Sequence, residues 1–322
     1  MDFVIEKIVH TDAISIPSEY PLPRPSFEHE WISYETTAPE ELVERVKDAT
    51  IIVTNKSKLT AEVLAQCPKL KFIAELATGY NNIDIDYCKE HGIGVANIQG
   101  YSTDSVAEHA ITMMLMLSRS MIKTRKKMED GLWVNANCFC QLPYPIVDLK
   151  GRTLTICGAG SIGSRIGEIA KAFGMNVIKA EHRNASAVRP GYTAFAEAIA
   201  QADFLTVNCP LNADTENLIT AKEIATMKKS VIIINNARGG VVNEQDLVKA
   251  VLNGDIAGAA ADVASVEPLT SDHPYVQLQK NDNFLLTPHQ AWMSHDCLIA
   301  LVKQFGENLE AFHKGESLRR IV

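Results

Sequence analysis

Several features that mark other protein classes are missing from this sequence. Its seven cysteines include no CxxC pair, so the sequence suggests neither a zinc site nor a disulfide framework. The formal net charge of −8 argues against sequence-independent binding to nucleic acid. The longest membrane-like run, residues 110–117, lies between His109 and Arg119 and is far shorter than the ~20 residues of a transmembrane helix.

The N-terminus also lacks the pattern of a secretory signal. The stretch MDFVIEKIV carries acidic residues, and its apolar run is too short for a signal peptide. We therefore expect a cytoplasmic protein that binds small molecules and neither membranes nor nucleic acid. With 322 residues, of which 46% are hydrophobic and 22% are charged, the chain is long enough for two globular domains.

The stretch 153–182 has the pattern of a strand, a glycine loop, a helix and a second strand. Residues 153–157 form a short β-prone run that leads directly into GAGSIG at 158–163. Apolar residues then recur at helical spacing until Gly174, and the strand pattern resumes at 176–180. This order predicts a βαβ unit.

The glycines of this loop fit the binding of a dinucleotide. Gly158 permits the tight turn, Gly160 lets the backbone approach a pyrophosphate, and Gly163 lets the helix pack closely on the sheet. The helix N-terminus then faces the anion. Glu181 follows Gly163 by 181 − 163 = 18 residues, where a carboxylate would meet the ribose hydroxyls of the adenosine. A tight βα turn that binds no ligand is the alternative.

Strands alternate with helices along the whole chain, in two sets divided near residue 100. This alternation predicts an α/β protein with two doubly wound parallel-sheet domains. Because the glycine loop lies in the second set, we interpret that set as a Rossmann NAD-binding domain and the first as a flavodoxin-like substrate domain. We assign residues 1–100 to the substrate domain, completed by 294–322, and residues 101–293 to the NAD-binding domain. A long apolar helix, from the cap-type residues before Val106 to about Met121, should lie between domains or subunits.

Three side chains follow late strands of the second domain, and they suit hydride transfer to a 2-oxo acid. Because the carboxyl ends of parallel strands share one edge, Arg238, Glu267 and His289 should meet near the nicotinamide. Arg238 could bind the substrate carboxylate bidentately, and His289 could protonate the carbonyl oxygen. Glu267 would hydrogen-bond the imidazole, fix its tautomer and favour its protonated form.

Each of these residues also has a non-catalytic interpretation. Arg238 could be a solvated residue of a glycine loop, and Glu267, before a proline, could be a turn residue. Asp262 could be a strand-end cap. Their occurrence together, in this order and after a dinucleotide loop, favours the catalytic interpretation.

Several stretches of the sequence together are similar to one enzyme family. They are GAGSIG, NNARGGVVNEQDL, AADVASVEPL and TPHQAW, with TNKSKLT, ATGYNNID and YSTDSVAEH closer to the N-terminus. These stretches closely resemble the motifs of the D-isomer-specific 2-hydroxyacid dehydrogenases, and the likeness covers nearly the whole chain. ATGYNN and Trp292, after TPHQA, most resemble the glycerate dehydrogenase and hydroxypyruvate reductase branch.

The resemblance implies an NAD(H)-dependent oxidoreductase that interconverts a small 2-oxo acid, of the hydroxypyruvate or glyoxylate type, and its D-2-hydroxy acid. Arg238 would orient the substrate, Glu267 and His289 would form an acid/base relay, and the backbone amides around Thr78 and Gly79 would receive the substrate carboxylate. Dinucleotide contacts are implied for Ser161, Ile162, Glu181, Cys209, Asn236, Ala237 and Arg238, and Asp262 would lie near the nicotinamide. Family members are usually homodimers joined through the dinucleotide domain, and their C-terminal helix crosses back to the first domain.

Three positions qualify this resemblance. Asn81 stands where many members carry Asp. The sequence Glu181-His182-Arg183 favours NAD, because the carboxylate would repel a 2′-phosphate, but Arg183 could welcome one, so NADP(H) stays open. Trp292 is expected either in the wall of the substrate pocket or in the core.

Two other functions stay open at this point. The same fold serves corepressors that sense a dinucleotide, although the complete Arg-Glu-His set favours catalysis. A related dehydrogenase with another small anionic substrate, such as formate or phosphite, is the third reading, and the presence of Glu267 argues against formate because formate enzymes of this family replace that carboxylate.

Overall fold

The structure, a computed structural model, describes residues 5–322. The chain divides into two compact units: Met1–Tyr101 with Ser294–Val322, which we call the split unit, and Ser102–Met293, which we call the continuous unit. The first strand was predicted from Phe3, but Phe3 and Val4 lie outside the described residues. The assignment of one unit to the substrate and the other to the dinucleotide stays a prediction.

The split unit is a five-stranded parallel sheet with the order β2-β1-β3-β4-β5, which is the order of flavodoxin-like folds. Its strands are β1 (Glu6–His10), β2 (His29–Ser33), β3 (Ile51–Thr54), β4 (Phe72–Glu75) and β5 (Gly94–Ala96). Its helices are α1 (Pro39–Val46), α2 (Ala61–Leu64), α3 (Ile85–His91) and α10 (His295–His313), with a short 3₁₀ turn at Ala13–Ser15.

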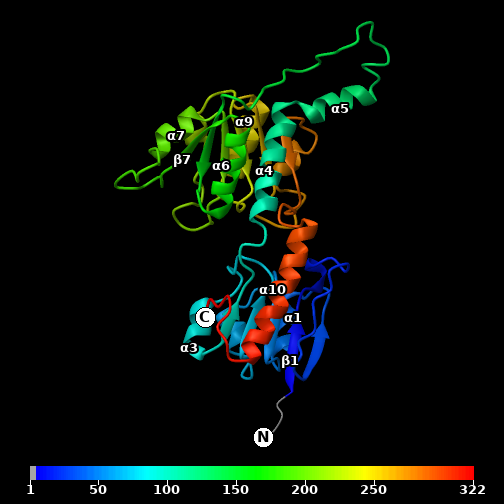
Figure 1. Cartoon of the computed structure of the whole chain (residues 1–322), viewed down its shortest axis with the longest axis vertical. Helices are drawn as coiled ribbons and strands as arrows, with labels where there is room; N and C mark the ends of the chain where they lie inside the picture. Colours follow the sequence, from blue (N-terminus) through cyan, green and yellow to red (C-terminus); the bar gives the residue numbers. More distant parts are fainter. Residues whose placement is uncertain (1–4) are drawn as a thin grey trace. The chain divides into compact units, whose positions relative to one another are not determined.

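The C-terminal helix α10 completes the split unit (Figure 1). Ser294 caps it by accepting a hydrogen bond from the backbone N–H of Cys297 at 3.3 Å. On its apolar face the ring of Phe312 stacks on Phe72 of β4, with 4.4 Å between the ring centroids. The last part of the chain is therefore needed to cover the sheet formed by the first part.

The continuous unit is a six-stranded parallel sheet with the order β11-β10-β9-β8-β6-β7. Its strands are β6 (Thr153–Cys157), β7 (Asn176–Ala180), β8 (Phe204–Val207), β9 (Ile232–Asn235), β10 (Gly258–Ala261) and β11 (Phe284–Leu286). A parallel bridge joins Thr193 to Ala180, beyond β7. If Thr193 counts as a third strand reduced to one residue, the order becomes the doubly wound Rossmann order.

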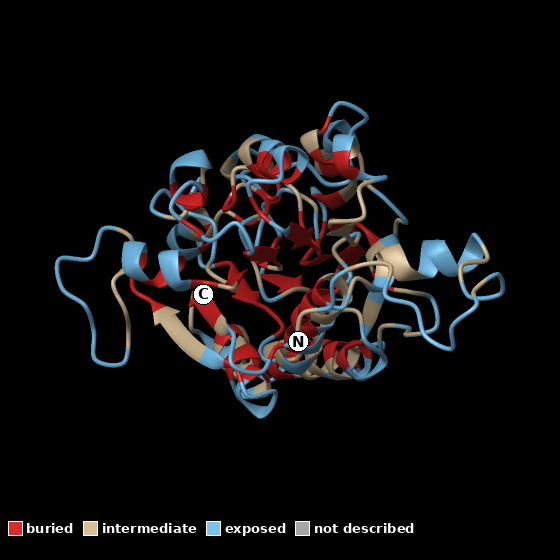
Figure 2. Ribbon diagram, turned by 90° about the horizontal axis from the view of Figure 1, so that it is seen from above, coloured by how far each residue is buried: buried red, intermediate tan, exposed pale blue. Residues whose placement is uncertain are grey.

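Helices cover both faces of this second sheet. They are α4 (Thr103–Ser118), α5 (Met121–Glu129), α6 (Ser161–Ala172), α7 (Phe195–Gln201), α8 (Ala221–Ile224) and α9 (Glu244–Asn253), with a 3₁₀ helix at Pro274–Leu278. Ile156 packs with residues of α4 and α6, whereas Cys157 packs with residues of α7, α8 and α9. Most strands are therefore buried on both sides, and they appear red in Figure 2. The prediction of two parallel-sheet α/β domains is confirmed.

The predicted long apolar helix corresponds to α4, which ends at Ser118, close to the predicted end near Met121. A second helix, α5, follows it after Ser120, which has a φ of 51°. Most of the apolar residues of α4, including Ala107 and Met114, are buried within the continuous unit, largely against α6. Exposed apolar side chains occur instead in residues 121–146, beyond which the chain returns to β6 (Figure 1).

Candidate active site

Loops after the strands of the continuous unit carry nearly all of its predicted site residues. The glycine loop follows β6, Glu181 follows β7, Cys209 comes after β8, Arg238 comes after β9, and Asp262 follows β10. Because all six strands are parallel, these loops lie along one edge of the sheet. The strand order reverses between β6 and β8, which is the position where open α/β sheets bind their ligands.

The glycine loop has the geometry that its sequence predicts. Gly158 has a φ of +92°, and a Cβ atom added there would lie 2.6 Å from the backbone nitrogen of Cys209. A Cβ on Gly163 would overlap the carbonyl oxygen of Gly158, so this glycine permits the close helix packing. Gly160, by contrast, has no heavy atom within 4 Å of an added Cβ. The loop is thus tightly packed at Gly158 and Gly163 and open at Gly160. Ser161 and Ile162, which follow Gly160, are the first residues of α6.

A cavity of about 940 Å³ lies along this edge, lined by the glycine loop and by the loops after β7 and β8. Asn208 lines it, and the buried Oδ1 of this residue has no hydrogen-bond partner among residues 5–322. Both polar side-chain atoms of Asn236, in the loop after β9, are buried and unpartnered among the same residues. Buried polar groups without partners fit a polar ligand, and the open side of Gly160 fits a pyrophosphate.

The carboxylate of Glu181, at the far end of this cavity, is already hydrogen-bonded. Its side chain is buried, and it accepts hydrogen bonds from Arg189 Nε at 2.8 Å and Arg189 Nη2 at 2.6 Å. The backbone N–H groups of His182 and Arg189 also donate to it, at 2.8 and 2.9 Å. Chiefly because of the hydrogen bonds from Arg189, the pKa of Glu181 is lowered to about 2.

His289 and Glu267 meet, as the sequence predicts. His289 Nδ1 lies 2.6 Å from Glu267 Oε2, and Oε1 of the same carboxylate accepts the backbone N–H of Ala264 at 2.9 Å. The histidine has a φ of 50°, and its backbone N–H donates to the carbonyl of Asp262 at 2.8 Å. Within residues 102–293, Nε2 of His289 makes no hydrogen bond, so this nitrogen can take a further partner.

Asp262 holds the loop that carries His289. Its buried carboxylate accepts hydrogen bonds from Thr287 Oγ1 at 2.5 Å and from the backbone N–H groups of Gln290 and Ala291 at 3.0 and 2.9 Å. His109 of α4 approaches the same carboxylate at 3.7 Å and contacts Thr287 Oγ1 at 3.0 Å. Burial lowers the pKa of His109, and Asp262 opposes this shift. These contacts resemble those of a strand-end cap, so the predicted nearness of Asp262 to the nicotinamide stays a prediction.

Arg238 is exposed on a rigid loop. Asn235 fixes this loop, because its side chain accepts the N–H of Ala237 at 3.1 Å and donates to the carbonyl of Arg238 at 2.9 Å. The guanidinium donates to the carbonyl of Ala237 at 2.7 Å. A Cβ added to Gly239 would overlap the backbone of Ala264, three residues before Glu267. The arginine loop and the glutamate loop are therefore in direct contact.

Thr78 and Gly79 lie in the split unit, in the loop after β4. Within residues 5–101 and 294–322 their backbone N–H groups donate to no protein acceptor. Glu75, which is fully buried, braces this loop by accepting the N–H of Ala77 at 3.2 Å and the side-chain amide of Asn82 at 2.9 Å. Burial raises the pKa of Glu75 well above its usual value. The loop thus presents two unused amide donors.

Sequence reasoning missed several residues that support these sites. His109 is the last residue of the family-like stretch YSTDSVAEH, and Glu75 lies two residues before ATGYNNID, so their positions in or near these motifs are the only signal. Arg189 has no such signal, because its contact with Glu181 depends on how the loop after β7 folds back. Trp292 is half-buried beside Ala291, and its predicted place in the substrate pocket stays a prediction.

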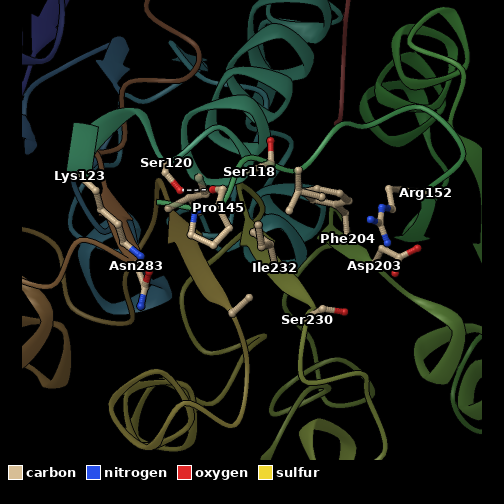
Figure 3. Close-up of a pocket in the computed structure, with 13 residues that line it drawn as sticks. Ser118, Ser120, Lys123, Pro145, Arg152, Asp203, Phe204, Ser230, Ile232 and Asn283 are labelled. Atoms are coloured by element: carbon tan, nitrogen blue, oxygen red, sulfur yellow. Dashed lines mark hydrogen bonds between the residues drawn. The ribbon is translucent and has the colours of Figure 1, made fainter. Parts of the chain in front are cut away.

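A smaller cavity of about 250 Å³ lies at the opposite, amino-terminal edge of the same sheet (Figure 3). Arg152 and Asp203, which precede β6 and β8, line it together with Asn283, which precedes β11. Ser120 and Pro145 close it from the region around α5, joined by a 2.8 Å hydrogen bond from Ser120 Oγ to the carbonyl of Pro145. Because the dinucleotide loops lie at the other edge, this cavity is separate from the candidate active site.

Neither a metal cluster nor a membrane span was found in the described part of the chain. Over residues 5–322, no three His, Cys, Asp or Glu side chains are grouped so that they could hold a metal ion. Over the same residues, no helix has the length and apolarity needed to cross a bilayer.

The chain is similar to known proteins in both sequence and structure. Residues 111–291 match the family described as D-isomer specific 2-hydroxyacid dehydrogenase, NAD binding domain. The chain is 37% identical over 292 residues to a hydroxypyruvate reductase of Blautia hydrogenotrophica, covering 89% of this chain and 90% of that protein. It is 38% identical over 294 residues to a glycerate dehydrogenase of Methylorubrum extorquens, covering 90% and 91%. A D-lactate dehydrogenase of Aquifex aeolicus, solved with NAD and lactic acid, aligns with a TM-score of 0.81 and 28% identity over 96% of each chain.

The Rossmann sheet, its glycine loop and the paired histidine and glutamate define a dinucleotide-dependent oxidoreductase. The chain belongs to the D-isomer-specific 2-hydroxyacid dehydrogenase family, and it is an NAD-dependent enzyme of that family. The names of its relatives also confirm the resemblance to the glycerate dehydrogenase and hydroxypyruvate reductase branch.

Proposed function

We propose that this dehydrogenase reduces a small 2-oxo acid of the hydroxypyruvate or glyoxylate type to its D-2-hydroxy acid, with a His-Glu acid/base relay and an arginine anchor. The 2.6 Å contact between His289 Nδ1 and Glu267 Oε2 carries this proposal. It leaves Nε2 as the nitrogen that can reach a substrate. A histidine acts as a general acid when a carboxylate holds one ring nitrogen and the other ring nitrogen faces the substrate oxygen.

His289 supplies the proton in this reaction. A bound NADH would supply the hydride for the carbonyl carbon. The N–H of protonated His289 Nε2 would donate its proton to the carbonyl oxygen. The imidazole is left neutral, and Glu267 stabilises the positive charge that the ring carries before the transfer. In the reverse direction the neutral imidazole accepts the proton of the substrate hydroxyl.

Arg238 anchors the substrate in this proposal. A guanidinium can donate two parallel hydrogen bonds to a carboxylate, and the side chain of Arg238 is exposed while its loop touches the loop of Glu267. The free amides of Thr78 and Gly79 are the second set of carboxylate donors, and Trp292 would form part of the substrate pocket. A short 2-oxo acid is the class of substrate whose charge and carbonyl these groups match.

The dinucleotide would be held along the carboxyl edge of the continuous unit. Gly158, Gly160 and Gly163 shape the pyrophosphate turn, and Glu181 stands at the ribose end. The remaining proposed contacts are Ser161, Ile162, Cys209, Asn236, Ala237 and Asp262. We propose NAD(H) as the preferred cofactor, because an acidic residue directly after the second strand of a dinucleotide-binding sheet is typical of NAD sites.

We further propose a homodimer in the cytoplasm, joined through the continuous unit. Large apolar side chains are exposed between α5 and β6, among them Val134 at 89%, Phe139 at 87% and Leu142 at 72%. Exposed apolar groups gathered on one segment are typical of an interface. Sedimentation of the purified protein, which should give the mass of two chains, tests this state.

A panel of 2-oxo acids, assayed with NADH by the loss of its absorbance, tests the proposed function. Hydroxypyruvate and glyoxylate should be reduced with the highest kcat/KM, and the product should be the D-isomer. Tight NADH binding without turnover of any 2-oxo acid would favour a corepressor-like sensor instead.

A further inference from the structure

The ribose end of the dinucleotide cavity contains an ion pair between Glu181 and Arg189. Glu181 accepts three side-chain hydrogen bonds from Arg189: two from Nε, of which the one to Oε1 is 3.0 Å long, and one from Nη2. It also accepts two hydrogen bonds from backbone N–H groups. A carboxylate has about four lone-pair sites. Its capacity is therefore filled by protein donors, and none remains for ribose hydroxyls unless Arg189 withdraws.

The pairing also removes the charge that would exclude a phosphate. An unpaired carboxylate at this position would repel a dianionic 2′-phosphate, but a carboxylate that is hydrogen-bonded to a guanidinium forms a neutral pair. At this end of the cavity, the positive charge of Arg189 thus offsets the negative charge of Glu181.

Arg189 is placed to bind an anion as well as to hold Glu181. It lines the dinucleotide cavity, and 51% of its side chain is exposed, whereas that of Glu181 is 3% exposed. The guanidinium carbon lies 4.0 Å above the ring of Tyr192, which fixes its plane. Nη1 makes no hydrogen bond within residues 102–293. One edge of the guanidinium therefore faces Glu181, and the remaining donors are available to a phosphate.

Arg183, which the sequence suggested as a possible ligand of a 2′-phosphate, makes hydrogen bonds to the backbone instead. Its Nη1 donates to the carbonyls of Asn217 and Leu218, at 3.0 and 3.3 Å. Arg183 lines the same cavity, so it is the natural comparison for Arg189.

We propose that Arg189 sets the cofactor specificity of this enzyme by neutralising Glu181 and donating to the 2′-phosphate of NADP(H). The inference rests on the dinucleotide site proposed above. It predicts that the enzyme accepts NADPH as a second cofactor besides NADH, in spite of the acidic residue after β7, and that the identity of residue 189 controls the ratio of the two affinities.

Titration of the purified, full-length protein with NADH and NADPH, followed by the fluorescence of the bound nicotinamide, tests this proposal. No 2-oxo acid is added, so a wrong substrate assignment leaves the result unchanged. Wild-type protein should bind NADPH within roughly tenfold of NADH. Arg189→Gln should lower the affinity for NADPH relative to NADH by about tenfold or more, because a charged hydrogen-bond donor to phosphate is lost. Arg189→Lys should keep part of the NADPH affinity.

Arg183→Gln is the matched control, and it should leave the ratio of the two affinities near the wild-type value. Competition by ADP-ribose and by its 2′-phosphate repeats the comparison without the nicotinamide. Tight binding of NADH with no measurable binding of NADPH to the wild type would overturn the proposal. So would an unchanged ratio in Arg189→Gln, or a loss of NADPH affinity in Arg183→Gln alone.

Discussion

The two ends of the dinucleotide edge hold their charged side chains in different ways. At the reaction end, the buried carboxylate of Asp262 fixes the loop of His289 through one side-chain and two backbone hydrogen bonds. At the ribose end, the buried carboxylate of Glu181 is held mainly by Arg189, whose own side chain is half exposed. The first arrangement fixes the loop of the proposed general acid, His289, whereas the second balances the charge of Glu181.

This contrast suggests a division of roles along one sheet edge. Changes at the reaction end should alter the rate of hydride transfer, whatever the cofactor. Changes at the ribose end should alter the choice of cofactor and leave the chemistry of the bound substrate intact. Single substitutions at the two ends can test this division.

Replacing His289, the proposed proton donor, should have the largest effect. His289→Gln should lower kcat for 2-oxo acid reduction by about 10²- to 10⁴-fold, because a neutral amide cannot transfer the proton. Stopped-flow reduction measures this rate, and NADH titration checks that the cofactor site is intact. A variant that retains full kcat would remove His289 from the role of general acid.

Replacing Arg238, the proposed substrate anchor, should have the second-largest effect. Arg238→Lys should lower kcat/KM for the 2-oxo acid by about 10- to 100-fold, since a point charge cannot donate two parallel hydrogen bonds. Arg165→Lys is a suitable control, because Arg165 forms its ion pairs with Asp104 and Glu168 on the surface of α4 and α6. Equal kcat/KM values in the two variants would show that Arg238 does not hold the substrate.

Asp262 should affect both stability and rate. In Asp262→Asn the new amide group cannot accept one of the backbone N–H bonds, so we expect a loss of about 1–3 kcal/mol in the free energy of unfolding. A lower kcat should accompany it, because the loop of His289 loses its anchor. Asp86→Asn, at an exposed pair with Lys89, should change the stability far less in urea denaturation. Wild-type stability in Asp262→Asn would contradict the anchoring role.

The smallest effect should come from the pH dependence of the Glu181 pair. Because the folded pKa of Glu181 is lowered to about 2, the stabilisation is fully present above the ordinary glutamate pKa of 4.5 and is lost as the pH falls toward 2. The urea midpoints of wild type and Arg189→Gln should therefore converge as the pH is lowered through this range. A difference that grows at low pH would contradict the ion pair.

Local patterns explain which parts of the fold could be predicted from the sequence. The βαβ unit is specified by short-range signals, and β6 and β7 occupy the predicted residues 153–157 and 176–180. β2 was missed because it is a half-buried strand at the sheet edge that follows a proline-rich stretch, so it lacks a continuous apolar run. The short helix α7 was missed as well.

The same distinction applies to the candidate site. Strand ends predicted that Arg238, Glu267 and His289 come from neighbouring loops, because parallel strands share one carboxyl edge. The contact of His109 with Thr287 joins residues 178 positions apart, so no local pattern could indicate it. The pairing of Arg189 with Glu181 depends on the path of an exposed loop, which composition does not determine.

The pH dependence of Glu267→Gln tests the relay most directly. The neutral amide no longer stabilises the protonated imidazole of His289, so the falling limb of the reduction profile should move to lower pH. Fitting kcat/KM for the 2-oxo acid against pH, in wild type and variant, measures this shift. A profile that stays in place, with kcat/KM unchanged, would show that Glu267 and His289 do not act together.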